Sequence, residues 1–142
     1  MILIIAFFLS VYYDNSFSVG YSSILERVSA YPILLLPAAL FLGAGVYLVL
    51  KSHSLVIAHE GAPKFVDSGV YSVVRHPMYL GALMILLGVL FLKFSLLALA
   101  IALVYLVLSS WMASYEERDL VRKLGRRYLD YQKRVSKLIP GL

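Results

Sequence analysis

The chain contains no cysteine, and only 15% of its 142 residues are charged. The lack of cysteine excludes a disulfide framework, a thiol nucleophile and a metal site with cysteine ligands. A soluble protein of this length could not bury the hydrophobic residues that make up 61% of the sequence. Because these residues fall in blocks long enough to cross a bilayer, we expect an integral membrane protein.

The positive charges indicate membrane topology rather than nucleic-acid binding. Of the thirteen Lys and Arg residues, eight follow residue 115, and Lys51, Lys64 and Arg75 lie in 51–78. The positive-inside rule therefore places the 51–78 loop and the C-terminal tail on the cytoplasmic side. We expect both termini to be cytoplasmic and no nucleic acid to bind.

The apolar blocks predict a single all-α domain, 1–142, built as a membrane helix bundle. We expect four transmembrane helices, at Met1–Tyr13 with a continuation to Val19, Ala30–Leu50, Pro77–Leu92 and Phe94–Ala113. The third and fourth helices should form an antiparallel hairpin, because little more than Lys93 and Ser95 separates them. Pro37 should kink the second helix by removing a backbone hydrogen bond.

The polar connection before the third helix holds His53, His59 and Glu60. Their spacing does not place two ligands on one helical face, and no third cluster of ligands occurs elsewhere. We therefore expect no metal site and interpret these histidines as solvated residues of the membrane interface.

A second feature of this loop is its junction with the third helix. Pro77 favours a helix start, which places Arg75 and His76 where N–H donors and partial positive charge gather. With Tyr71 and Tyr79 beside them, these residues form a candidate site for a carboxylate or phosphate. The alternative is that Arg75 extends to the lipid headgroups and the tyrosines belong to an aromatic belt.

The composition changes again at Glu116 and Glu117. Residues 115–137 predict an amphipathic cytoplasmic helix whose apolar stripe is Leu120, Leu124, Tyr128, Tyr131 and Val135. Its basic flanks suit anionic lipids. The two adjacent carboxylates at the end of a membrane helix instead favour a cationic partner.

These two regions together resemble the isoprenylcysteine carboxyl methyltransferases and their relatives, including the phospholipid methyltransferases. The resemblance covers 61–140, whereas 1–50 match only as generic membrane helices. Its first motif consists of Ser68, Gly69, Tyr71, Arg75, His76, Pro77, Tyr79 and Gly81. Its second consists of Glu116, Glu117, Leu120, Leu124, Gly125, Tyr128, Tyr131 and Val135, followed by Pro140.

The resemblance implies a membrane methyltransferase that uses S-adenosylmethionine on the cytoplasmic side, with 61–140 as its catalytic core. It implies a lipid-like or prenylated acceptor. The implied catalytic residues are Arg75, His76 and Tyr79. The implied cofactor-binding residues are Pro63, Lys64, Phe65, Val66, Tyr71, His76, Pro77, Met78, Tyr79, Glu116 and Glu117.

In this interpretation the cofactor's carboxylate suits Arg75 or the helix start at His76, and its ammonium and sulfonium suit Glu116 and Glu117. If the acceptor is an amine, His76 is the nearest candidate base. One departure concerns the acceptor: animal prenylcysteine enzymes carry an arginine where this chain has Met112. Two alternatives are an NADPH-dependent reductase related to sterol reductases, which share an Arg-His-Pro-x-Tyr motif, and a non-catalytic membrane protein of the same fold.

Overall fold

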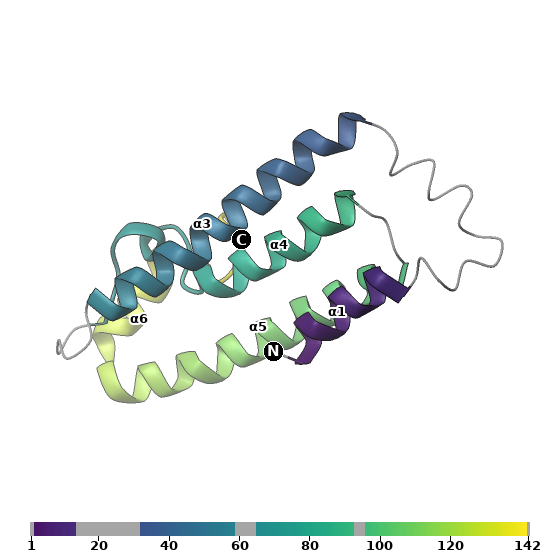
Figure 1. Ribbon diagram of the computed structural model, residues 1–142. Helices are drawn as coiled ribbons and strands as arrows, with labels where there is room; N and C mark the ends of the chain where they lie inside the picture. Colours follow the sequence, from purple (N-terminus) through teal and green to yellow (C-terminus); the bar gives the residue numbers. More distant parts are fainter. Residues whose placement is uncertain (1, 14–31, 59–64, 93–95, 142) are drawn as a thin grey trace. The chain divides into compact units, whose positions relative to one another are not determined.

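The computed structural model describes residues 2–13, 32–58, 65–92 and 96–141 (Figure 1). Every regular element in these ranges is helical. The elements are α1 (Ile2–Tyr13), the 3-10 turn η1 (Pro32–Leu34), α3 (Leu35–Ala58), the 3-10 turn η2 (Gly69–Ser72), α4 (Pro77–Leu92), α5 (Leu96–Leu124) and α6 (Arg126–Arg134). The expected all-α class is confirmed.

Two of the described segments, Pro32–Ala58 and Leu96–Leu124, are long and apolar enough to cross a membrane. Two shorter apolar helices, α1 and α4, accompany them. The membrane character of the chain follows from these helices and from the composition. A count of four crossings stays a prediction, and so does the hairpin, because its connection at 93–95 lies outside the described residues.

The chain divides into two compact units, 1–45 with 83–107, and 46–82 with 108–142. In the first unit, α1 lies against α5 through a buried cluster of Phe7, Leu86, Leu90, Ala98 and Ala102 (Figure 1). Small alanines on α5 let the large ring of Phe7 approach the helix, which gives this unit a close-packed apolar centre.

The second unit joins the loop before α4 to the C-terminal part of the chain. Val74 and Ser136 form an isolated parallel bridge, and the N–H of Arg75 donates to the Ser136 carbonyl at 2.8 Å. The N–H of His76 donates to the Lys137 carbonyl at 3.2 Å. Buried Leu138 follows directly. The unit therefore positions both motifs found in the sequence.

Three expectations about the helices are corrected by the structure: the end of the second helix, the kink at Pro37 and the end of the fourth helix. The second predicted helix was expected to end at Leu50, but α3 continues to Ala58 and includes Lys51 and His53. Pro37 falls in the first turn of α3, where a missing N–H breaks no interior hydrogen bond, so the predicted kink has no cause.

The third correction is that α5 runs without interruption to Leu124, through the expected boundary at 113–115. The sequence there contains no helix breaker before Gly125, whose φ of 57° and ψ of −132° end the helix. A separate amphipathic helix over 115–137 is therefore wrong, and only α6, Arg126–Arg134, follows the turn. The continuous helix fixes the faces on which Glu116 and Glu117 lie.

Candidate functional site

The centre of the site is the carboxylate of Glu117, on α5. Its Oε1 lies 3.0 Å from His76 Nε2 and 3.1 Å from Arg75 Nε. The N–H of Arg75 Nε is not directed at the oxygen, so this contact is an ion pair without a hydrogen bond. Because Glu117 and His76 are both buried, the three side chains form a shielded charge network that links α5 to the start of α4.

Gln132 on α6 completes this network and was not predicted from the sequence. Its side-chain Nε2 donates to Glu117 Oε2 at 2.9 Å, and its backbone carbonyl accepts from Arg75 Nη1 at 3.4 Å. The sequence does carry a signal, because Gln132 lies four residues after buried Tyr128 and so shares its helical face. With these contacts, both oxygens of Glu117 have partners inside the protein.

Glu116 has the opposite environment, although it is adjacent in sequence. Its side chain is 49% exposed, against 11% for Glu117. Tyr79 Oη donates to Glu116 Oε1 at 2.5 Å, and His76 Nδ1 lies 3.5 Å from Oε2. The ring of Tyr79 stacks on that of His76, with centroids 5.7 Å apart. The site therefore presents one accessible, oriented carboxylate.

At the start of α4, where an anion site was expected, the first two backbone N–H groups already have partners within the protein. The backbone N–H groups of Arg75 and His76 already donate to the carbonyls of Ser136 and Lys137. The guanidinium of Arg75 is held by Glu117 and by the Gln132 carbonyl. The structure thus gives Arg75 contacts inside the protein, and its predicted contact with a ligand carboxylate stays a prediction.

An aromatic cluster supports the network from the side of α6. The Phe65 ring lies 5.6 Å from Tyr128 and 5.2 Å from Tyr131, centroid to centroid, and Arg127 lies over it at 5.3 Å. Tyr131 Oη donates to the Tyr71 carbonyl at 2.6 Å, which ties α6 to η2.

The tyrosine hydroxyls in this region stay protonated at neutral pH. Burial, together with the charge of Glu117, raises the pKa of Tyr128 to about 12. Burial also raises the pKa values of Tyr131 and Tyr71 above the ordinary value. Among them, the hydroxyl of Tyr131 donates a hydrogen bond to the Tyr71 carbonyl.

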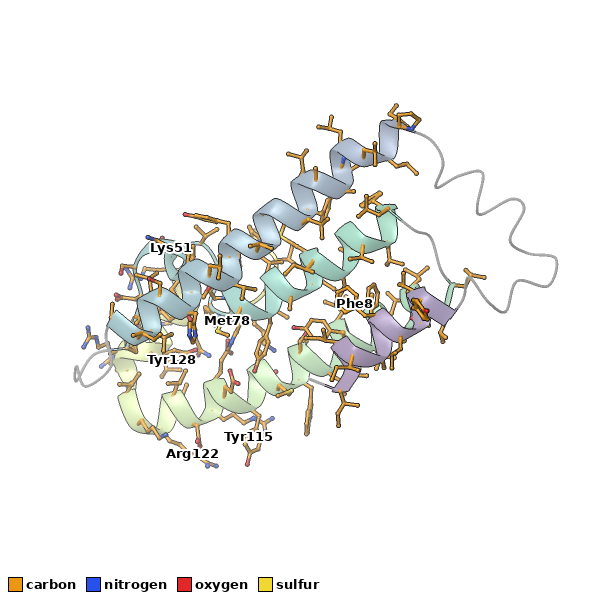
Figure 2. The ribbon with its side chains drawn as sticks, viewed as in Figure 1. Phe8, Lys51, Met78, Tyr115, Arg122 and Tyr128 are labelled. Carbon is orange, nitrogen blue, oxygen red and sulfur yellow. The ribbon has the colours of Figure 1, made fainter. Side chains whose placement is uncertain are left out.

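The other predicted site residues are distributed around this centre. Pro77 is buried, Phe65 and Val66 are half-buried, and Met78 is exposed. Pro63 and Lys64 lie outside the described residues, as do His59 and Glu60. Figure 2 shows the labelled Tyr115 and Arg122 projecting from α5, and the exposure of Tyr115, 66%, places it on the outer surface.

Comparison with known proteins gives the family. The phospholipid methyltransferase family model matches residues 30–127, well over half of the chain. The chain is 36% identical over 74 residues to the methanethiol S-methyltransferase of Pseudomonas deceptionensis, covering 51% of this chain and 27% of that protein. It is 34% identical over 90 residues to the protein-S-isoprenylcysteine O-methyltransferase B of Arabidopsis thaliana, covering 63% of this chain and 46% of that protein.

The chain spans less than half the length of these relatives. No solved structure shows significant similarity to it. The matched region includes α3, α4 and α5, together with the Arg75–His76 and Glu116–Glu117 pairs of the site. The family expected from the two motifs is confirmed, and the chain belongs to the phospholipid methyltransferase family.

Proposed function

We propose that this chain transfers a methyl group from S-adenosylmethionine to a lipid-like acceptor at the cytoplasmic membrane face. The family and the methyltransferase relatives support the reaction class. The observation that carries the proposal is the contrast between the two glutamates: Glu117 is occupied inside the protein, whereas Glu116 presents its carboxylate outward.

This arrangement fits a cationic ligand. An exposed carboxylate that is oriented by Tyr79 and His76 offers a charge-assisted contact to the ammonium or sulfonium of the methyl donor. Glu117 contributes to that contact indirectly. It contacts His76 Nε2 and so orients the ring whose Nδ1 faces Glu116. We assign Arg75 and His76 to orientation of the carboxylates. Among the described residues, the remaining proposed lining is Phe65, Val66, Tyr71, Pro77 and Met78.

When bound, the cofactor would supply an electrophilic methyl group on a sulfonium. The acceptor's nucleophilic atom would form a bond to the methyl carbon while the carbon–sulfur bond breaks, so the protein would mainly need to align the reactants and exclude water. A carboxylate or thiolate acceptor needs no base. His76 has a carboxylate oxygen near each ring nitrogen, so an amine acceptor would require one of these contacts to open.

The two relatives differ in the acceptors that their names state, one a prenylated cysteine and the other a small thiol. We favour a lipid-like acceptor because exposed apolar side chains of α5, including Leu108, Trp111 and Met112, precede the glutamates. An amphiphile can reach such a surface by lateral diffusion in the membrane. Met112 offers the tail of such an amphiphile an apolar contact. A cationic residue at the same position would instead hold a carboxylate.

Calorimetry in detergent with S-adenosylmethionine and S-adenosylhomocysteine tests the cofactor site. Glu116→Gln removes the charge and keeps the shape, so we expect S-adenosylmethionine affinity to fall about ten- to a hundredfold, the range for a charged hydrogen bond of roughly 1.5–3 kcal/mol. The matched control is Asp119→Asn, an exposed carboxylate on the same helix. Equal affinities for all three proteins would contradict the assignment.

The cytoplasmic position of the site is tested by labelling, which the absence of native cysteine makes simple. Single cysteines at Ser68 and Ser136 should react from the cytoplasmic face, and one at Ser22 from the opposite face. Reaction of Ser22→Cys and Ser68→Cys from the same side would contradict the proposed topology.

A further inference from the structure

The C-terminal segment Val135–Leu138, which we call the clasp, holds the start of α4 through its backbone. The carbonyls of Ser136 and Lys137 accept the N–H groups of Arg75 and His76 at 2.8 and 3.2 Å. Hydrogen bonds of this kind fix the backbone at the point where the Arg75 and His76 side chains leave it. The position of these side chains against Glu117 therefore depends on where the clasp lies.

The clasp is in turn attached to α5 by one side chain. Lys137 Nζ donates to the Ser110 carbonyl at 2.7 Å and to Ser114 Oγ at 2.5 Å, with Ser110 Oγ at 3.5 Å. Ser110, Ser114 and Glu117 are spaced four and three residues apart, so they share one face of α5. Lys137 therefore reaches the helical face that carries the central carboxylate.

The environment of Lys137 sets it apart from the surface lysines. Among the described Lys and Arg residues, only Arg75 and Lys137 are not exposed. Arg75 has an ion-pair partner in Glu117, whereas the hydrogen bonds of Lys137 within the described residues go to hydroxyl and carbonyl oxygens. Its ammonium is nevertheless near enough to Glu117 to act electrostatically on that carboxylate. A shielded ammonium costs desolvation energy, and these hydrogen bonds offset that cost in the position that the clasp occupies here.

We propose that Lys137 is a positioning residue of this site. By binding α5 between Ser110 and Ser114, its ammonium sets the distance between α5 and the clasp. The clasp carbonyls then hold Arg75 and His76 in register with Glu117. An effect of Lys137 on methyl transfer rests on the proposed function. Its effect on the position of His76 does not, and it can be measured without a methyl donor or acceptor.

The experiment follows His76 by nitrogen-15 NMR of the full chain labelled at histidine, in detergent. The sequence has three histidines, so His53→Gln and His59→Gln assign the remaining imidazole. The variant is Lys137→Met, which keeps the apolar stem and removes the ammonium. The matched control is Lys133→Met, because Lys133 is exposed and contacts only Asp130 in the described residues.

We expect Lys137→Met to shift the His76 ring signals and to speed exchange of its hydrogen-bonded ring N–H about tenfold or more, because the clasp loses its attachment. Lys137→Arg should restore both observables, and Lys133→Met should leave them unchanged. Unchanged His76 signals in folded Lys137→Met would overturn the proposal.

A second variant keeps the test decisive if Lys137→Met fails to fold. Ser114→Ala removes a hydroxyl acceptor and leaves the lysine in place. It should move the His76 signals in the same direction by a smaller amount, and an unchanged spectrum overturns the proposal. In an enzyme that methylates a supplied acceptor, Lys137→Met should also lower kcat more than it changes KM, because one misplaced group disturbs alignment more than binding.

Discussion

Replacing Glu117 and Glu116 in turn by glutamine separates a structural carboxylate from a ligand-binding one. Both substitutions remove one negative charge and keep the side-chain volume. At Glu117 the change leaves the shielded Arg75 beside a neutral amide, and only one oxygen remains to accept from His76 and Gln132. At Glu116 the tyrosine hydroxyl of Tyr79 still has an amide oxygen to bond.

The expected sizes differ because the two environments differ. Side chains of Arg75 and Glu117 are 12% and 11% exposed, so breaking their pair leaves a shielded charge, a change that costs about 3–5 kcal/mol. Glu116 is 49% exposed, and loss of a solvated charge contributes about 0–1 kcal/mol. For a chain of this size the first loss corresponds to a fall in Tm of roughly 10–20 °C and the second to a few degrees.

The assay is thermal unfolding of both variants in the same detergent, followed by circular dichroism, with ligand binding measured at a temperature where both are folded. We expect Glu117→Gln to lower Tm strongly and Glu116→Gln to lower ligand affinity with little change in Tm. Similar Tm values for the two variants, or a larger loss for Glu116→Gln, would refute the division of roles between the two glutamates.

Two further predictions concern a buried tyrosine and a close helix contact. The raised pKa of Tyr128, about 12 in the folded protein against 10.0 for an unperturbed tyrosine, means that the unfolded chain loses this proton first. The contribution of Tyr128 to stability should therefore be intact below pH 10 and fall by roughly 2–3 kcal/mol as pH rises from about 10 to about 12, in addition to the losses from Tyr131 and Tyr71. Tyr128→Phe should lose less Tm between pH 9 and 11.5 than wild type or the exposed control Tyr115→Phe, and equal losses would contradict the burial argument. In the other unit, a Cβ at Gly88 would lie 2.7 Å from Leu42 Cγ and 3.0 Å from its backbone nitrogen, whereas one at Gly43 meets nothing within 4 Å. Gly88→Ala should cost about 1–3 kcal/mol in thermal unfolding and Gly43→Ala should be neutral or stabilising by up to about 1 kcal/mol, and the reverse order would be inconsistent with this packing.

Helix ends could be predicted from the sequence where a particular residue marks them. The predicted Pro77–Leu92 helix has the observed bounds, because proline fixes its start and a polar Lys93 follows its apolar run. The end of α5 was missed because the change from apolar to charged residues at 114–119 alters solvation without breaking the helix. The true break, Gly125, needs a positive φ that only the backbone reveals.

The sequence brought together the two motifs that the structure places side by side, but it did not indicate how their side chains pair. Adjacent Glu116 and Glu117 look equivalent in the sequence, and their separation into exposed and buried groups depends on the register of α5 against α4. Gln132 and Lys137 act through contacts with residues 57 and 27 positions away, respectively. Such long-range pairings depend on tertiary packing, which helical periodicity does not encode.

The central claim is methyl transfer to an amphiphile at the Glu116 site, and transfer of a radiolabelled methyl group from S-adenosylmethionine tests it most directly. The purified chain, reconstituted in vesicles, would be offered a farnesylated cysteine analogue, phosphatidylethanolamine or methanethiol, each with wild type, Glu116→Gln and Asp119→Asn. We predict label in a lipid-like acceptor with wild type and Asp119→Asn, and at least about tenfold less with Glu116→Gln at limiting donor. Label confined to methanethiol, or equal labelling by all three proteins, would contradict the account.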